Sequence, residues 1–179
     1  MFLEKTIRRN PQLIEACLDL HQRGQILPDT YVIDLDTILT NAKNIIESAK
    51  QHHLEMYFML KQLGRNPIIA KELIKLGYSG AVAVEFNEAK IYMDHNIPIS
   101  NVGHLVQVPK ALLKTLIDYK CEYFTLYSIE KARDINECLK GTKRKQKVML
   151  RIISDYDKIY SGQHAGFHIH DLENVVNEL

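Results

Sequence analysis

The sequence predicts an α/β fold made of repeated strand–helix units. Short apolar runs begin near Met56, Gly80, Pro98, Tyr123 and Lys147, so that successive starts lie 24, 18, 25 and 24 residues apart. Amphipathic stretches separate these runs, and a repeat of this length suits one βα unit. Nearly continuous apolar strands are typical of a parallel sheet that is covered by helices. The Asn-Gly and Asp-Gly pairs that mark β-hairpins are absent between the runs.

The part of the chain before the first apolar run predicts two helices. Residues 11–23 begin with Pro11, which suits a first helical turn, and carry apolar side chains at helical spacing. A short extended piece is expected at residues 30–33. A second helix is expected at residues 36–51, with Asp36 as its N-cap.

Each later apolar run is followed by a helix pattern, at residues 66–76, 87–95, 109–119 and 128–139, and a last helix begins at Asp171. This pattern fits both an open doubly wound sheet and a (β/α)8 barrel. The dinucleotide-binding G-x-G-x-x-G signature is missing after the first strand, where the sequence is KQLGRNP, and the GxxxxGK(S/T) phosphate loop is missing as well. Both absences favour a barrel, whose sites lie at the carboxyl ends of its strands.

Composition and charge exclude several classes of protein. The 23 Lys and Arg residues nearly balance the 22 Asp and Glu residues, which excludes a strongly basic nucleic-acid-binding protein. No apolar run reaches the roughly 18 residues of a membrane span, and Glu4 and Lys5 interrupt the start, so no secretory signal is predicted. Cys17, Cys121 and Cys138 are far apart and odd in number, which predicts small core residues rather than disulfides or zinc ligands. We expect a cytoplasmic protein without nucleic-acid or membrane partners.

Lys61 is the most informative single residue. It ends the first apolar run, and Asn66 and Pro67 behind it can cap and open the following helix. Lys61 is therefore expected at the carboxyl end of the first strand. A lysine there, partly desolvated by apolar neighbours, can attack an aldehyde to form a Schiff base. A solvated lysine at a strand end is the alternative that spacing alone leaves open.

Several motifs in a fixed order resemble the alanine-racemase-like proteins of fold-type III, which depend on pyridoxal 5′-phosphate (PLP). TYVIDLDTILTNAKNI resembles the opening of these proteins, and YFMLKQLGRNP resembles their first barrel strand, whose lysine carries the cofactor. GYSGAVAVEFNEAK, NVGHLVQVP and YFTLYSIEKA are similar to their second, third and fourth βα units. The strings KQ-GRNP and GHLVQ-P are typical of the YhfX group within this family. The resemblance covers essentially the whole chain.

The resemblance implies a PLP-binding (β/α)8 barrel in which Lys61 forms the internal aldimine. In the racemases this lysine also moves the α-proton of an amino-acid substrate on one face, while the cofactor serves as an electron sink. For the full-length protein the resemblance implies a homodimer.

Three other residues are candidates for cofactor binding. Arg65 offers a planar fork for a carboxylate or phosphate, whereas its neighbour Asn66 is expected to cap a helix. His104 ends the third strand, where it either orients the cofactor or shuttles a proton, or serves as a hydrogen-bonded loop residue. Arg151 lies within the apolar strand at residues 148–154 and must be paired or face a polar interior.

Two positions depart from the racemase pattern. Arg151 stands where alanine racemases place a lysine that supports an arginine near the cofactor ring. The segment SGQHAGF resembles their G-M-x-R-x-G-F turn but lacks the arginine, and has Gln163 and His164 nearby. The resemblance therefore does not transfer the detailed racemase chemistry to this region.

Two other clusters are not predicted to be sites. His164, His168 and His170 lack an accompanying carboxylate or cysteine at a recognised ligand interval, so no metal site is predicted. The basic run at residues 143–147 is interpreted as a solvated loop rather than a nucleic-acid site.

The chain is short for the barrel that it predicts. A complete barrel needs about 250 residues, with roughly 200 as a lower limit, and these 179 residues supply about five of the eight βα units. We expect a helical extension at residues 1–27 and an incomplete PLP-binding barrel at residues 28–179. Strands six to eight, the main phosphate site and the β-rich second domain are expected to be absent. Alone, this chain is expected to bind PLP weakly or not at all and to lack racemase activity.

Three functions therefore stay open. The chain is the N-terminal portion of a PLP-dependent amino-acid-racemase-like enzyme, a non-enzymatic PLP-binding or homeostasis protein, or a half-barrel that a partner completes without a ligand. The motifs around Lys61 favour the first, the short chain favours the second, and the exposed sheet edges favour the third.

Overall fold

Five parallel strands form the central sheet of the computed structural model, which describes residues 2–157 and 165–179. All neighbouring pairs are parallel, and the order of the strands in the sheet follows the order in the chain. The predicted α/β class and parallel sheet are therefore confirmed. The strands are β1 (Tyr57–Phe58), β2 (Gly80–Ala83), β3 (Ile99–Val102), β4 (Tyr123–Leu126) and β5 (Lys147–Leu150).

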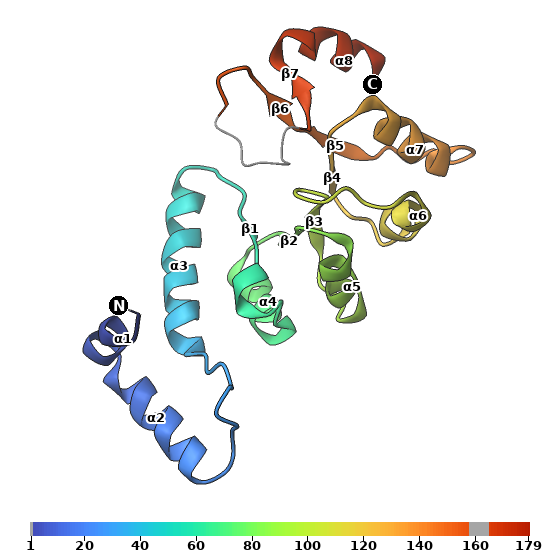
Figure 1. Cartoon of the computed structure of the whole chain (residues 1–179). Helices are drawn as coiled ribbons and strands as arrows, with labels where there is room; N and C mark the ends of the chain where they lie inside the picture. The colour runs from blue at the N-terminus through green and yellow to red at the C-terminus, as the bar shows by residue number, and fades with distance from the viewer. Residues whose placement is uncertain (1, 158–164) are drawn as a thin grey trace. The chain divides into compact units, whose positions relative to one another are not determined.

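A helix lies in each connection between neighbouring strands, and Figure 1 shows these helices on one side of the sheet. A doubly wound sheet has helices on both faces, whereas a barrel has all of them outside. The observed arrangement is that of a partial barrel, as predicted. The helices are α4 (Pro67–Leu76), α5 (Phe86–Asp94), α6 (Lys110–Asp118) and α7 (Ile129–Leu139).

The sheet curves strongly. Oη of Tyr57, on β1, lies 3.4 Å from Oε2 of Glu122, which immediately precedes β4. Strands β2 and β3 lie between them, and in a flat sheet neighbouring strands are about 4.8 Å apart with side chains standing perpendicular to the surface. A hydrogen bond between these two side chains therefore requires a concave face. Glu122 also pairs with Lys147 of β5, at 2.9 Å from Nζ to Oε1.

A short two-stranded parallel sheet follows the five-stranded one in the chain. β5 is followed, after Arg151, by β6 (Ile152–Ile153), which pairs in parallel with β7 (Phe167–His168). The amide of Arg151 donates to the carbonyl of Leu126 at 2.9 Å, and its own carbonyl accepts from Phe167 at 2.8 Å. The single strand predicted at residues 148–154 is thus observed as β5 and β6, and Arg151 between them is hydrogen-bonded to Leu126 of β4 and to Phe167 of β7. The five-stranded sheet agrees with the predicted five βα units, and β7 adds a two-residue strand beside the continuation of β5.

The last helix follows β7 in the chain. A short 3₁₀ turn, η2 (Ile169–Asp171), follows β7 and leads directly into α8 (Leu172–Glu178). The predicted start of a helix near Asp171 is confirmed, and β6 and β7 lie between β5 and this helix in the chain.

The core lies between the sheet and its outer helices. Phe124 and Leu126 of β4 and Leu113 of α6 are almost completely buried. Phe58 of β1 makes edge-on contacts with two tyrosines, Tyr78 and Tyr92, at centroid distances of 6.3 and 6.5 Å. Edge-to-face pairs of this kind add about 0.5–1.5 kcal/mol to the burial of the rings themselves.

The cysteines do not form disulfides. Cys121 is buried, and burial raises the pKa of its thiol to about 12. A thiol with so high a pKa is not an active nucleophile at neutral pH, so Cys121 is a core residue as predicted. Cys17 and Cys138 are half-buried.

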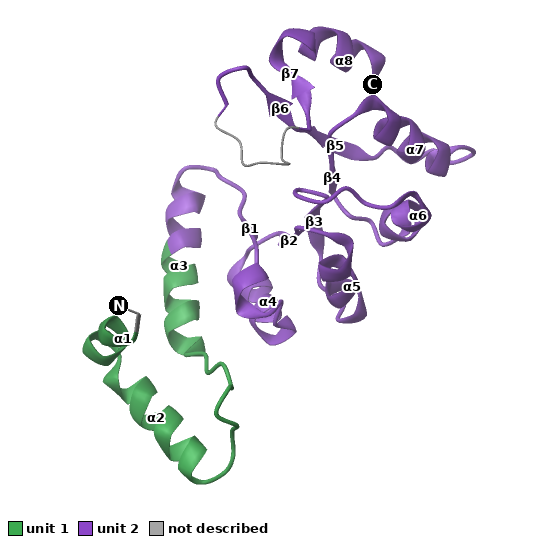
Figure 2. Ribbon diagram, viewed as in Figure 1, with its two compact units in different colours: residues 1–44 green, residues 45–179 purple. Residues whose placement is uncertain are grey.

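The chain divides into two compact units, residues 1–44 and 45–179 (Figure 2). The first contains α1 (Phe2–Arg9), α2 (Pro11–Gln22) and the beginning of α3 (Leu35–Gln51). The predicted helix after Pro11 is confirmed, and Asn10 caps it by accepting from the amide of Leu13 at 3.1 Å. None of the helices in the described part of the chain is long and apolar enough to cross a membrane.

Residues 30–33, where a short extended piece is expected, form neither a helix nor a strand of a sheet. One expectation for this unit is wrong. The N-cap of α3 is Asp34 rather than Asp36, because Asp34 lies just before the first helical residue and accepts from the amide of Thr37 at 2.9 Å and from its hydroxyl at 2.8 Å. These hydrogen bonds lower the pKa of the Asp34 carboxyl.

Candidate functional site

Three of the four predicted site residues lie at the carboxyl ends of strands. Lys61 follows β1, His104 follows β3, and Arg151 stands between β5 and β6. Because all the strands are parallel, their carboxyl ends form one edge of the sheet, which is the edge where barrel proteins carry their sites. Arg65 follows the same turn as Lys61 but forms a different set of contacts.

Lys61 begins a short 3₁₀ turn, η1 (Lys61–Leu63), directly after Leu60, which is 3% exposed. The lysine itself is exposed, so the expected partial desolvation by apolar neighbours is not what the structure shows. No residue in the ranges 2–157 and 165–179 holds its ammonium group in a hydrogen bond or ion pair. The amine is therefore accessible to a ligand at the carboxyl edge of the sheet.

Arg65 anchors the turn behind Lys61. Gly64 and Arg65 both have left-handed backbone conformations, with φ of 65° and 55°, and the amide of Arg65 donates to the carbonyl of Leu60 at 3.0 Å. Nε and Nη2 of its guanidinium lie 2.8 and 2.6 Å from Oε1 of Glu88. The other carboxylate oxygen of Glu88 accepts from the amide of Val84 at 2.7 Å.

Glu88 explains why Arg65 is placed there. Its side chain is only 2% exposed, and a buried carboxylate requires a charged or hydrogen-bonding partner. Arg65 and the Val84 amide provide both. Through Glu88, the Arg65 guanidinium links the η1 turn to β2 and α5. The sequence pattern of α5 offered no sign that its glutamate is buried.

Asn66 performs the capping role that the sequence predicts. Its Oδ1 accepts from the amides of Ile68 and Ile69 at 2.9 and 3.3 Å, and Pro67 occupies the first helical position of α4. This cap fixes the point at which the chain leaves the η1 turn.

His104 and Arg151 are connected through Tyr127. The hydroxyl of Tyr127 donates to the carbonyl of His104 at 2.5 Å, and the Arg151 guanidinium lies over the Tyr127 ring, 5.2 Å from its centroid. A cation in this position is attracted by the face of the ring. The side chain of His104 is exposed, and that of Arg151 is half-buried. Tyr127, which the sequence did not single out, thus brings two of the predicted site residues together.

The loop after β3 is held by Gln107. Its amide nitrogen donates to the carbonyls of Gly103 at 3.0 Å and Thr125 at 2.9 Å. Gly103 has a φ of 84°, and a Cβ there would lie 3.4 Å from the Thr125 carbonyl. These contacts fix the course of the chain on both sides of His104. The motif GHLVQ contains both the glycine and the glutamine, but the sequence alone did not predict that Gln107 holds the loop.

Buried polar side chains connect the middle strands. The amide of Asn101 on β3 and the hydroxyl of Thr125 on β4 lie 3.0–3.1 Å apart, and the Asn101 amide is also 3.3 Å from Sδ of Met149 on β5. Asn101 is 3% exposed and Thr125 is 8% exposed. A polar residue inside an apolar strand was the only sequence signal for this network.

The C-terminal histidines are not isolated from carboxylates. Nε2 of His168 lies 3.0 Å from Oδ1 of Asp155, and the rings of His168 and His170 stack at a centroid distance of 4.8 Å. Asp155 is 13 residues from His168 in the sequence, which is why the spacing of the histidines did not reveal it. Gln163 and His164 lie outside the described residues.

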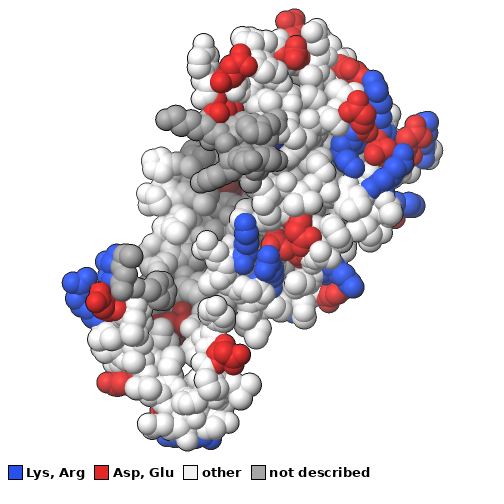
Figure 3. All heavy atoms as spheres, viewed as in Figure 1, with Lys and Arg blue, Asp and Glu red and all other residues white. Residues whose placement is uncertain are grey.

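The basic run at residues 143–147 makes ion pairs with neighbouring acids. Arg144 pairs with Asp118 at 3.2 Å, and Lys147 pairs with Glu122 at 2.9 Å. Figure 3 shows positive and negative side chains interspersed on the visible face. These contacts fit the interpretation of the run as a solvated loop.

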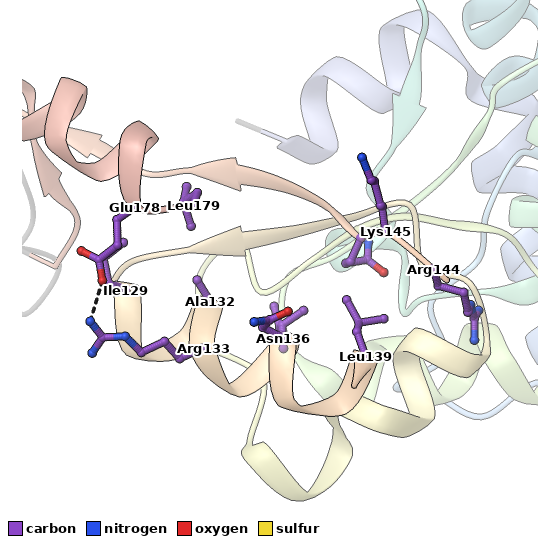
Figure 4. A pocket seen from close by; sticks show the side chains of 11 residues that line it. Ile129, Ala132, Arg133, Asn136, Leu139, Arg144, Lys145, Glu178 and Leu179 are labelled. Atoms are coloured by element: carbon purple, nitrogen blue, oxygen red, sulfur yellow. Dashed lines mark hydrogen bonds and ion pairs between the residues drawn. The ribbon is translucent and has the colours of Figure 1, made fainter. Parts of the chain in front are cut away.

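A pocket of about 440 Å³ lies away from the predicted site. Figure 4 shows its lining, which comes from α7, residues 144–146 and the end of α8. Arg133 and Glu178 form an ion pair of 2.5 Å on its wall. None of the four predicted site residues belongs to its described lining.

Comparisons with known proteins place this geometry in a family. Residues 33–179 match the family model described as alanine racemase, N-terminal domain. The chain is 41% identical over 179 residues to the uncharacterized protein YhfX of Escherichia coli (strain K12), and the match covers 100% of this chain and 46% of that protein. The chain thus spans about half the length of this curated relative.

Two solved structures are similar in fold. D-threonine aldolase from Filomicrobium marinum matches with a TM-score of 0.60 and 21% identity, over 76% of this chain and 36% of that one. Alanine racemase from Clostridium difficile 630 matches with a TM-score of 0.56 and 19% identity, over 80% of this chain and 36% of that one. At these identities the likeness shows the fold alone.

The parallel sheet and the helices on its outer side define a partial barrel with the fold of these two solved structures. The chain belongs to the alanine racemase N-terminal domain family. The family resemblance seen in the sequence, including the likeness to YhfX, is confirmed.

Proposed function

We propose that this chain is the N-terminal portion of a PLP-dependent, racemase-like enzyme that acts on an amino acid, and that Lys61 holds the cofactor. The observation that carries the proposal is the position of Lys61. Its amine is exposed at the carboxyl end of the first strand and has no partner among the described residues. The membership of the chain in the alanine racemase N-terminal domain family supports the same role.

The residues at this edge suit the chemistry of PLP. The cofactor has an aldehyde, which an amine can bind covalently, and a phosphate, which cations and hydrogen-bond donors can hold. Lys61 supplies the amine, Arg151 a cation over the Tyr127 ring, and His104 an imidazole whose main-chain carbonyl accepts from the Tyr127 hydroxyl. Arg65 is occupied by Glu88, so its role is to hold the turn that carries Lys61.

When bound, the cofactor would act as an electron sink for the substrate carbanion. The chain's own contribution would be to orient the cofactor and to move a proton. The Lys61 amine is the group we propose for proton transfer at the α-carbon, because general acid–base groups must lie within hydrogen-bond reach of the proton they move. For the complete protein we propose an amino-acid substrate and a homodimer. The 179-residue chain alone is proposed to bind PLP weakly and to lack turnover.

The test of the lysine assignment is chemical labelling. PLP is added to the complete protein, the mixture is reduced with borohydride, and the modified lysines are identified by peptide mass spectrometry. We expect the label on Lys61 and a visible absorption band that Lys61→Ala abolishes. Lys71→Ala is the matched control, because Lys71 is an exposed lysine of α4. A band that persists in Lys61→Ala, or a label spread evenly over surface lysines, would contradict the assignment.

A second measurement separates an enzyme from a non-enzymatic PLP-binding or homeostasis protein. Exchange of the α-proton of amino acids is followed by NMR in deuterated buffer with the PLP-loaded complete protein. Exchange that depends on Lys61 supports the racemase-like proposal. PLP binding without exchange favours the binding protein instead, and the absence of any PLP binding favours a half-barrel that a partner completes.

A further inference from the structure

A second cluster of functional groups lies at the carboxyl edge formed by β6 and β7. Asp155 follows β6 by two residues, His168 ends β7, and His170 lies in the η2 turn that comes next. Because β6 and β7 are parallel neighbours, the residues at their carboxyl ends meet in space. Neither Lys61 nor its anchoring residues belong to this cluster.

The distances suit a bound cation. The three residues each present one ligand atom, and these atoms all lie within 4.8 Å of one another. Nε2 of His168 and Oδ1 of Asp155 are 3.0 Å apart. In a tetrahedral zinc site with bonds of about 2.0–2.2 Å, the ligand atoms are roughly 3.3–3.5 Å apart, so adjustments of about 1 Å would complete the arrangement. The Asp155 side chain is 73% exposed and has the freedom to make them.

We propose that Asp155, His168 and His170 form a divalent transition-metal site that is best suited to zinc. Two imidazole nitrogens and one carboxylate oxygen are ligands that zinc prefers, whereas magnesium prefers an all-oxygen environment. Three protein ligands leave a fourth position open to water or a small ligand, as in zinc sites that are not purely structural. This proposal does not depend on PLP binding.

Coordination changes the hydrogen bonds of His168 in a defined way. Its Nδ1 accepts from the amide of His170 at 3.3 Å. Coordination through Nε2 places the ring proton on Nδ1, so this long hydrogen bond is lost and the contact between Nε2 and Asp155 is replaced by two bonds to the metal. Because metal-bound imidazoles must be unprotonated at the ligating nitrogen, we expect affinity to fall in acid.

Isothermal titration calorimetry of the full chain with zinc chloride tests the proposal. We expect one zinc ion per chain. Each of Asp155→Ala, His168→Ala and His170→Ala should lower the zinc affinity at least about tenfold, because mutation of residues that only hydrogen-bond to metal ligands already lowers metal affinity 10–100-fold. Magnesium chloride should give no binding. His95→Ala is the matched control, an exposed histidine at the end of α5, and it should bind zinc like the parent.

Asp155→Ala keeps the test decisive if His168→Ala disturbs β7, because the exposed Asp155 side chain does not contribute to the core. Cobalt(II) gives a second readout, since its visible spectrum reports imidazole coordination. The proposal fails if zinc does not bind, if Asp155→Ala and His170→Ala bind as tightly as the parent, or if His95→Ala weakens binding as much as they do.

Discussion

Arg65 shows how the role of a single residue depends on a partner that is distant in sequence. Next to Lys61, an arginine fork is well placed to bind a phosphate or carboxylate. The structure directs that fork to Glu88, 23 residues away, at 2.6–2.8 Å. Glu88 is almost completely buried, while the Arg65 side chain is 35% exposed. The buried carboxylate therefore requires this ion pair, whereas the more exposed guanidinium does not.

Replacement of Glu88 tests this view at the residue scale. Glu88→Gln keeps an acceptor for the Val84 amide but removes the charge that Arg65 pairs with. Hydrogen bonds to charged groups contribute about 1.5–3 kcal/mol, so we expect the free energy of unfolding to fall by about that amount in urea denaturation. Glu88→Ala should cost more, because it also leaves the Val84 amide without its acceptor.

The control for this pair is Glu72→Gln. Glu72 pairs with Lys75 one helical turn away on the surface of α4, and exposed pairs contribute little. We expect a change within about 0.5 kcal/mol. Equal effects of Glu72→Gln and Glu88→Gln would show that the buried position of Glu88 has no energetic importance.

The position of Lys61 could be predicted from the sequence, but its surroundings could not. An apolar run, a lysine, a turn and an Asn-Pro pair fix the end of a strand and the start of a helix through local chemistry. The exposure of Lys61, the pairing of Arg65 with Glu88 and the contact of Asp155 with His168 arise from packing between segments 13 or more residues apart. Local patterns do not contain this information.

At the scale of the element, the start of one helix could be predicted from the local sequence and the start of another could not. The sequence predicts the cap of α4 correctly because Asn66 directly precedes Pro67, which leaves a single position for the first turn. For α3 two aspartates compete, and the structure selects Asp34 over Asp36. A shift of two residues is decided by the last residues of the preceding loop, where no proline fixes the boundary.

The α4 cap gives a prediction about helix stability. Asn66→Ala removes the acceptor for the amides of Ile68 and Ile69, and the loss of such a cap costs about 1 kcal/mol. We expect the urea midpoint to fall accordingly. Asn66→Asp keeps the acceptor and adds a negative charge at the helix N-terminus, which the helix dipole favours, so this variant should match or exceed the parent. If Asn66→Ala matches the parent, the cap does not stabilise α4.

The α3 cap gives a prediction about pH. The pKa of Asp34 is lowered from 3.8, first by the hydrogen bond from the Thr37 amide and then by that from its hydroxyl. A lowered folded pKa means that the stabilisation is fully present above pH 3.8 and is lost as the pH falls through the folded pKa. Helical circular dichroism during acid titration should therefore fall less steeply in Asp34→Asn than in the parent.

Asp36→Asn is the matched control for this titration, because Asp36 is the neighbouring carboxylate that does not accept from the Thr37 amide. We expect this variant to follow the parent through the acid range. A larger effect of Asp36→Asn than of Asp34→Asn would show that Asp36, and not Asp34, is the N-cap of α3.

At the scale of the whole molecule, the alternation of strands and helices was predictable, and the curvature of the sheet was not. Apolar runs separated by 18–25 residues specify parallel βα units because each unit must bury its own helix face. The five strands of the main sheet were predicted, whereas β7 was not, since it consists of only two residues and has no apolar run of its own. The curvature is visible only in contacts across the concave face between segments distant in sequence, such as that of Tyr57 with Glu122.

This concave contact leads to a prediction for alkaline stability. Burial, and then the nearby charge of Glu122, raise the pKa of Tyr57 from 10.0 to about 12. Because the folded state keeps the phenol protonated, the stabilisation is fully present below pH 10 and is lost as the pH rises towards about 12. We expect urea denaturation at increasing pH to show a steeper loss of stability in the parent than in Tyr57→Phe. Tyr31→Phe serves as the control, because that ring is 96% exposed, and it should follow the parent. Identical alkaline slopes for the parent and Tyr57→Phe would show that the β1-to-β4 contact does not form in solution.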